Sequence, residues 1–319
     1  MPQENPECQW LLLATRGLNP DKKSGNLIQT QIPSNQCPPR RKKRNGFGHG
    51  EGGNRFFLPL PLQGREVPCN SPIETHLVYM PEKLPLTYTF CIDKELHWTS
   101  FDVVKKIRVA MREKKVGHAG TLDPLATGLV LVCTGKATKT IDSLMGQDKE
   151  YTGTIRLGAT TPSYDLETEP DALFPTDHIT EDQIRAVAAS MTGPQLQVPP
   201  MFSALKVDGK KLYELARKGK ETHREPRSVV ISEFEITGIR LPDVDFRVWV
   251  SKGTYIRSLA FDFGQACGSG AHLVALRRTR IGNLSVNDAR TIPQWLEWWQ
   301  SEAARLLSAA EAEDTSGQS

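Results

Sequence analysis

The sequence has no long apolar segment and no closely spaced pair of cysteines. The apolar run from Trp10 to Ala14 is too short for the core of a secretory signal, and no stretch approaches the length of a membrane span. Six scattered cysteines lack the spacing of a metal-binding or redox motif: Cys8, Cys37, Cys69, Cys91, Cys133 and Cys267. We therefore expect a soluble, cytoplasmic protein whose cysteines are free thiols in a reducing compartment.

A strong excess of basic residues is also missing. The chain has 40 Lys and Arg against 37 Asp and Glu, so its formal net charge is only +3. This balance excludes a protein that attracts nucleic acid through its overall charge, and any RNA-binding surface has to be a local patch. With 319 residues, the chain is long enough to bury a sizeable core in one large domain or two.

Both ends of the chain lack hydrophobic periodicity. Residues 1–85 are rich in Pro, Gly, Asn and Gln, and residues 313–319 are small or acidic. Such segments bury too little apolar area to offset the entropy of ordering, so we expect disorder in both. The basic run from Arg40 to Arg44 is either a nucleic-acid or sorting patch or a solvated charge run, and we favour the latter. Met80 stands just before the first predicted strand, which gives the hypothesis that translation starts there.

Between these ends, strands and helices follow one another without regular β-α-β alternation, which predicts an α+β domain. Thr99 opens a helix with Asp102 in the capping-box position. The remaining predicted elements are strands over 86–92, 129–133, 151–157, 229–239 and 244–250, helices over 136–144, 180–192, 256–266 and from Pro293 onward, and a mobile loop over 160–178.

The stretch from Val116 to Lys139 carries the clearest signal of chemistry. Glycines and Pro124 surround Asp123 and place its carboxylate on an irregular loop, which is followed by a short apolar run typical of a buried strand. A nucleotide-binding P-loop is excluded, because Ala137 stands where Ser or Thr is required after Lys136. The alternative for Asp123 itself is a turn residue whose side chain binds its own backbone.

The segment from Gly117 to Gly128, Gly-His-Ala-Gly-Thr-Leu-Asp-Pro-Leu-Ala-Thr-Gly, resembles the signature of the TruB family of tRNA pseudouridine synthases. The resemblance continues at Asp148 to Tyr151, Tyr164-Asp165, Phe202 to Lys206, Ser251 to Arg257 and Gly270 to Leu273. It covers roughly residues 86–291 and implies the pseudouridine synthase fold, a mixed and largely antiparallel sheet with flanking helices and a central cleft. A C-terminal helix over 292–312 would follow, with too little chain after Thr291 for the RNA-binding PUA module of many members. The sequence departs from the family pattern at Glu95 and Trp98, where members usually have Pro and Gly.

The resemblance also implies the residues of the active site. Asp123 would be the essential catalytic carboxylate, Arg257 its ion-pair partner, and Tyr151 a tyrosine that stacks on the target base and assists the final proton removal. His118 would help to displace the base and fill the vacated stack, while Lys139, Tyr255 and Leu276 would line the cleft. Taken alone, Tyr151 reads as a strand tyrosine, His118 as an isolated loop residue and Lys139 as a solvated lysine.

Basic residues that could hold the RNA gather in two places. Lys206, Lys210 and Lys218 belong to a basic segment over 206–227 that also contains Tyr213, and a solvated helix face is the alternative. Arg277, Arg278 and Arg280 form a second basic cluster. Phosphate contacts from such residues would position a folded RNA.

These observations predict an enzyme that isomerises the T-loop uridine of tRNA, at the position usually numbered 55. The resemblance implies no metal and no organic cofactor, and we expect a monomer whose partner is the T arm of tRNA. An RNA-binding or RNA-folding protein with vestigial catalysis is the alternative, although such a protein has no need of Asp123, Tyr151 and Arg257 together. Glycoside hydrolysis requires a pair of carboxylates, and the signature supplies only one.

Overall fold

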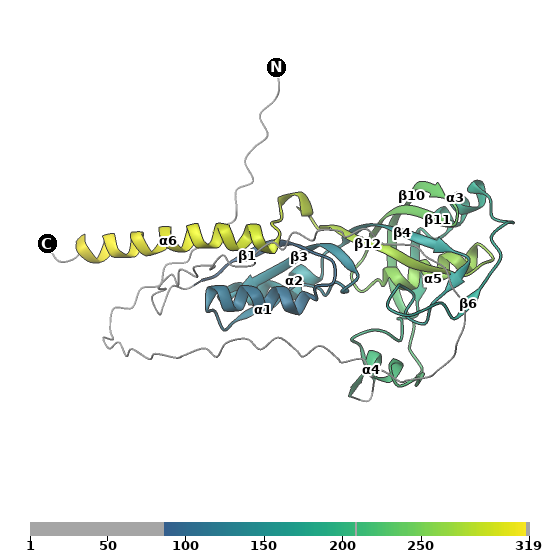
Figure 1. Ribbon diagram of the computed structural model, residues 1–319, viewed down its shortest axis with the longest axis horizontal. Coiled ribbons are helices and arrows are strands. Elements are labelled where there is room, and N and C mark those ends of the chain that lie inside the picture. The colour runs from purple at the N-terminus through teal and green to yellow at the C-terminus, as the bar shows by residue number, and fades with distance from the viewer. Residues whose placement is uncertain (1–85, 208, 317–319) are drawn as a thin grey trace, which may run out of the picture. The chain divides into compact units, whose positions relative to one another are not determined.

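A mixed sheet of nine strands organises the described part of the chain (Figure 1). The computed structural model describes residues 86–207 and 209–316; the predictions for residues 1–85 and for the end of the tail lie outside them. The sheet has the order β1-β3-β12-β4-β11-β10-β7, with β2 and β13 paired to β3 and β12. The strands are β1 Thr89–Lys94, β2 Val116–His118, β3 Ala126–Thr134, β4 Lys149–Leu157, β7 Gly193–Gln197, β10 Arg227–Arg240, β11 Asp243–Val250, β12 Ala271–Ile281 and β13 Leu284–Ser285.

Helices and two short hairpins complete the described part of the chain. The hairpins pair β5 Ala159–Thr160 with β6 Ala172–Leu173, and β8 Lys206–Val207 with β9 Lys210–Lys211. The helices are α1 Ser100–Met111, α2 Ile141–Met145, α3 Glu181–Ser190, α4 Leu212–Ala216, α5 Ile256–Ala266 and α6 Ile292–Ser316, with 3-10 turns η1 Gly135–Thr140 and η2 Val286–Asp288. The predicted α+β class is confirmed.

Strand β12 joins the two parts of the sheet. It runs parallel to β3 and antiparallel to β4. Among the described neighbours of the main sheet path, β12 and β3 are the parallel pair. Leu129, Val130, Leu131 and Val132 of β3 are all buried, as expected of a strand covered on both faces. Because β12 lies between β3 and β4, it borders the loop that precedes β3 and carries Asp123.

Local sequence signals account for the helices that flank the sheet. Thr99 and Asp102 form the predicted capping box at the start of α1, whose buried stripe includes Val103, Ile107 and Met111. Helix α6 packs on β1, where Trp295 and Trp299 contact the rings of Phe90 and Tyr88. The helices α3 and α5 pack on β10 and β12. No helix within the described ranges is both long and apolar enough to cross a membrane.

Several predicted elements differ in detail from the observed ones. The predicted helix over 136–144 is a 3-10 turn, η1, followed by α2, and the predicted loop over 160–178 contains the short β5–β6 hairpin. The predicted helix from Thr180 ends before Gly193 and Pro194, which begin the edge strand β7, where the missing N–H of proline is tolerated. Helix α6 continues to Ser316, beyond the predicted end at residue 312, since its last turns are rich in alanine and glutamate.

Candidate active site

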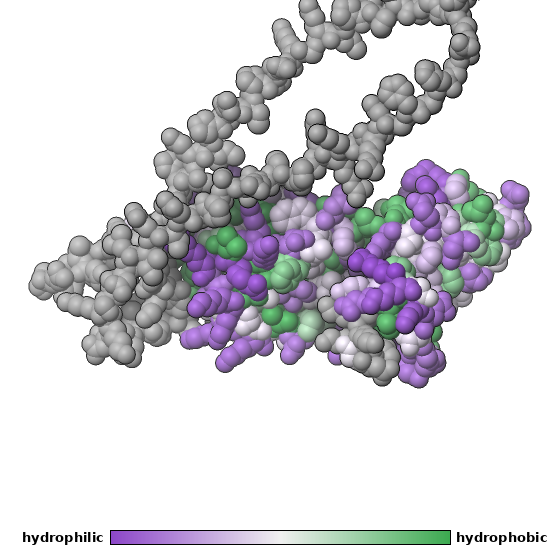
Figure 2. Space-filling model, turned by 60° about the horizontal axis from the view of Figure 1, so that its bottom comes forward, coloured by the Kyte–Doolittle hydropathy of each residue, from purple (hydrophilic) through white to green (hydrophobic). Residues whose placement is uncertain are grey.

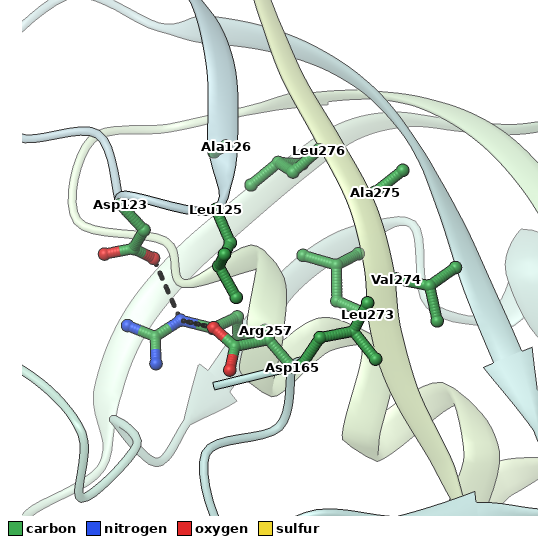
Figure 3. A pocket seen from close by; sticks show the side chains of 10 residues that line it. Asp123, Leu125, Ala126, Asp165, Arg257, Leu273, Val274, Ala275 and Leu276 are labelled. Atoms are coloured by element: carbon green, nitrogen blue, oxygen red, sulfur yellow. Dashed lines mark ion pairs between the residues drawn. The ribbon is translucent and has the colours of Figure 1, made fainter. Parts of the chain in front are cut away.

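A small open cleft lies between the loop before β3, the loop after β5, and strand β12 (Figure 3). Its walls are mostly apolar, and its polar lining consists of two carboxylates and one guanidinium. The lining residues are Asp123, Leu125, Ala126, Asp165, Leu166, Arg257, Leu273, Val274, Ala275 and Leu276. An apolar pocket with a few convergent polar groups is the usual form of a small-ligand or nucleobase site.

The carboxylate of Asp123 faces the guanidinium of Arg257 across this cleft. Asp123 Oδ2 lies 2.9 Å from Arg257 Nε, and the side chain of Asp123 keeps 39% of its surface exposed while that of Arg257 is buried. Opposite charges at this distance attract each other and restrict the position of the Asp123 carboxylate. The two residues are paired through a charge contact at Nε and without a bidentate hydrogen bond, and the contact leaves Asp123 accessible to a substrate.

A second carboxylate, Asp165, approaches the same guanidinium from the other side (Figure 3). Its Oδ2 lies 3.6 Å from Arg257 Nε, and burial raises the pKa of Asp165, opposed by hydrogen bonding from Ser163 and by the charge of Arg257. The cleft therefore holds a second acid besides the one that the signature supplies. Tyr164-Asp165 belongs to the family resemblance, but only the fold brings Asp165 close to Arg257.

Backbone carbonyls and a buried glutamine hold Arg257 in place. Arg257 lies in the first turn of α5 and donates to the carbonyls of Ser163, at 3.1 Å, and Phe202, at 2.9 Å. The amide of Gln197 accepts from Tyr255 N at 2.8 Å and donates to Tyr255 O at 3.1 Å. Gln197 thus satisfies the backbone where α5 begins, a task that capping side chains usually perform. No sequence signal pointed to Gln197.

The loop that carries Asp123 is anchored on both sides. Ser100 Oγ, at the start of α1, accepts from Leu122 N at 2.9 Å and donates to Leu122 O at 3.2 Å. Beyond the aspartate, Pro124 O accepts from His97 N at 2.8 Å and Asp123 O accepts from Ala126 N at 3.1 Å. These bonds hold the loop in the irregular conformation that was predicted from its glycines and from Pro124.

Lys94 is fully buried at the end of β1, just before the turn where the sequence departs from the family pattern. Its Nζ donates to the carbonyls of Glu95 and Trp98, at 3.0 and 2.7 Å. Burial lowers the pKa of Lys94 to about 8, although the charge of Asp123 opposes this shift. Glu95 and Trp98 therefore bind Lys94 through their backbone carbonyls. These bonds do not depend on the side chains that stand where family members usually have Pro and Gly.

The other predicted cleft residues differ in where the structure places them. Leu276 lines the cleft from β12, as predicted. Tyr255 lies at the start of α5 with the guanidinium of Arg227 5.6 Å from its ring centre, and burial raises the pKa of its hydroxyl. Tyr151 is buried in the core on β4 and is not among the residues that line the cleft. Its catalytic role stays a prediction.

His118 and Lys139 lie outside the lining of the cleft. The ring of His118 is partly buried at the end of β2, and burial lowers its pKa, with a further contribution from the charge of Arg278. Lys139 is exposed on η1. Both roles remain predictions. Among the described residues, no group of three or more His, Cys, Asp or Glu is arranged to hold a metal ion.

The structure places the two groups of basic residues that were predicted to bind RNA in different surroundings. Lys218 is exposed just after α4, whereas the side chains of Lys206 and Lys210 lie outside the described part. The prediction of an RNA contact is wrong for Arg278, which is buried. Arg277 is paired with Asp93 at 2.8 Å but keeps 39% of its side chain exposed, and Arg280 is exposed, so for these two the contact stays a prediction. On the face shown in Figure 2, hydrophilic residues predominate and hydrophobic ones form separate small patches.

The sequence matches both family models and individual known proteins. Two family models match adjacent ranges, TruB family pseudouridylate synthase (N terminal domain) over residues 108–256 and tRNA pseudouridylate synthase B C-terminal domain over residues 257–310. A protein of Flavobacterium johnsoniae named tRNA pseudouridine synthase B is 56% identical over 216 residues, which cover 66% of this chain and 94% of the relative. One of Parabacteroides distasonis with the same name is 54% identical over 201 residues, 61% of this chain and 86% of the relative.

Solved structures show the same similarity in three dimensions. A chain of the Cbf5-Nop10-Gar1 complex superposes with a TM-score of 0.53 at 30% identity, over 67% of this chain and 55% of that one. A chain of an H/ACA RNP bound to a substrate RNA containing 2′-deoxyuridine gives a TM-score of 0.50 at 28% identity, again over 67% and 55%. This chain thus spans about half the length of those two structures and nearly the whole length of its sequence relatives. It belongs to the TruB family of pseudouridylate synthases.

Proposed function

We propose that this protein isomerises uridine to pseudouridine in tRNA, and that its target is the T-loop uridine usually numbered 55. Its relatives named tRNA pseudouridine synthase B support the reaction and the class of RNA. The observation that carries the proposal is the ion pair between Asp123 and Arg257 at the edge of an apolar cleft. The cleft offers apolar walls to a nucleobase and one accessible carboxylate to the sugar.

The reaction requires no co-reactant. The N1–C1′ bond breaks, the uracil turns, and the C5–C1′ bond forms; C5 loses its proton and N1 gains one, so atoms and electrons balance. Asp123 assists either by attacking C1′ or by removing a sugar proton, and both routes begin with an ionised carboxylate. Arg257 attracts that carboxylate through the 2.9 Å contact and restricts where it lies.

The target base has to leave the RNA stack to reach the cleft. The apolar walls formed by Leu125, Leu273 and Leu276 would hold the extruded uracil while it turns. His118 ends β2, just before the loop that carries Asp123, and its lowered pKa favours the neutral ring at pH 7. A neutral aromatic ring can fill the place of the departed base, which lowers the cost of unstacking. We expect the protein to work as a monomer.

Asp123→Asn tests the proposal. We expect the variant to lose turnover of tRNA labelled with tritium at uridine C5, measured as tritium release, while its affinity for tRNA stays within about threefold of the parent. Asp93→Asn is a matched control, because Asp93 is also paired with an arginine, at 2.8 Å, but lies outside the lining of the cleft. Substantial turnover by Asp123→Asn would contradict the assignment.

The position of the product tests the choice of target. Pseudouridine mapping in tRNA from cells with and without the gene should show the loss of one modified T-loop position. Loss at a different position would keep the reaction and overturn the T-loop target. Unchanged maps together with retained tRNA binding would favour the alternative of an RNA-binding protein with vestigial catalysis.

A further inference from the structure

Arg278 is an arginine buried without a carboxylate partner. Only 1% of its surface is exposed, and its guanidinium forms no ion pair with any described residue. Burial of a charged group in this way is unfavourable unless hydrogen bonds compensate for the lost water. The proposed chemistry gives this side chain no role, and its burial rules out direct contact with RNA phosphates.

The guanidinium of Arg278 binds three backbone carbonyls on the two sides of Asp123. Its Nε donates to Leu129 O at 2.7 Å, and its two terminal nitrogens donate to Thr121 O at 3.3 Å and Gly120 O at 3.1 Å. Gly120 and Thr121 precede the aspartate, whereas Leu129 follows it in β3. One rigid side chain therefore ties the entry of the loop to its exit.

The backbone of Arg278 is fixed as firmly as its side chain. In the register of the sheet, Arg278 lies opposite Gly128 of β3 on one side and Tyr151 of β4 on the other. A Cβ atom added at Gly128 would lie 2.3 Å from the carbonyl oxygen of Arg278, so the two backbones are in close contact there. Gly128 also has φ +104°, which favours glycine. A fixed backbone gives the guanidinium a defined reach toward the loop.

We propose that Arg278 is a positioning residue for the isomerisation: its guanidinium fork holds the loop so that the Asp123 carboxylate keeps its place between Arg257 and the substrate sugar. This inference rests on the proposed function. Only arginine supplies several donors in a planar fork that can serve three carbonyls at once, whereas lysine offers a point charge.

The competing view is that Arg278 only stabilises the sheet. The two views differ in what happens to molecules that remain folded. If the role is positioning, the folded variant binds tRNA but reacts slowly. If the role is stability alone, fewer molecules are folded at a given temperature, and each folded molecule reacts at the parental rate.

The experiment compares Arg278→Lys and Arg278→Met with the parent protein in single-turnover assays on tRNA, with enzyme in excess and below the midpoint of thermal unfolding. We expect the rate constant of bound tRNA to fall on the order of 100-fold in both variants, since a shift of about 1 Å in a reacting group has an effect of that size. The dissociation constant for tRNA should change less than about threefold. Arg156→Lys and Arg156→Met serve as controls, because Arg156 lies on the adjacent strand β4, is paired with Asp243 and is partly exposed.

Each outcome decides the inference. Parental rate constants in either Arg278 variant, at any melting temperature, would overturn the positioning role, and so would failure of both variants to fold, because Arg278 would then support the whole sheet. Equal losses in the Arg156 controls would also overturn it. Absence of turnover by the parent protein would instead refute the proposed function itself.

Discussion

Arg257→Met should lower both the free energy of unfolding and the turnover, and the two losses should arise from different carboxylates. The substitution removes the contacts to Asp123 and Asp165 and two hydrogen bonds to carbonyls. Asp165 is buried, so the loss of its partner leaves an uncompensated charge, which lowers the free energy of unfolding by about 3–5 kcal/mol. Asp123 is 39% exposed, and its share of that loss is at most about 1 kcal/mol after solvent screening. The catalytic effect arises from Asp123, which loses its orientation.

A second substitution separates the two effects. Adding Asp165→Asn to Arg257→Met removes the uncompensated acid, so the double variant should regain about 1–3 kcal/mol of unfolding free energy. Its turnover should stay low, because Asp123 still lacks its partner. Chemical denaturation and single-turnover assays on the parent, both single variants and the double variant measure the two quantities independently. Recovery of turnover together with stability would refute the separation.

The stability of Arg257→Met should also depend on pH, with a sign fixed by Asp165. Burial raises the pKa of Asp165 in the folded protein, and loss of Arg257 raises it further. The folded state then binds more protons than the unfolded state at pH values between the two pKa values, so the free energy of unfolding falls as pH rises through that window. The variant should therefore be less destabilised relative to the parent at pH 5 than at pH 7. A difference independent of pH would refute the assignment to Asp165.

Two further predictions concern buried and exposed lysines. Lys94 has a pKa of about 8 in the folded protein against 10.5 ordinarily, so between these values the unfolded chain binds more protons and stability rises with pH. Relative to Lys94→Met, the parent should gain about 1.4 kcal/mol of unfolding free energy per pH unit from about pH 8 to 10, and parallel denaturation profiles would contradict this. If the segment over 206–227 grips the T arm, Lys210→Ala with Lys218→Ala should reduce the slope of log affinity against log salt concentration by about two. An unchanged slope for whole tRNA and for a T-arm stem-loop would make the segment a solvated surface.

Local sequence signals were sufficient to predict some of the elements. The capping box of Thr99 and Asp102 and the helical pattern over 256–266 depend on neighbours within a few residues, and both appear as predicted. Asp123 and Arg257 could be paired in advance because the family signature is long and specific. In each case the decisive information lies in one short stretch of chain.

The sequence predicted neither strand β12 nor the place of Asp165 in the cleft, because the deciding contacts are distant along the chain. The run Arg277 to Arg280 lacks the apolar alternation of a strand, and its arginines looked like an RNA-binding surface. Arg278 is buried only because carbonyls of a distant loop bind it, and no local pattern contains that information. Asp165 lies in a loop whose preceding residue, Tyr164, has φ +63°, so its path could not be derived from propensity.

The central place of β12 also sets an order of folding events. Arg278 is separated by 149 residues from Leu129 and by 158 residues from Gly120, so the loop that carries Asp123 receives its last anchor only after most of the chain has left the ribosome. Until β12 inserts, β3 and β4 belong to two separate half-sheets, each with an open edge. Contacts this distant in sequence form slowly, and open edges can pair with other chains in the meantime. The strand that completes the active site thus also covers the open edges of the two half-sheets.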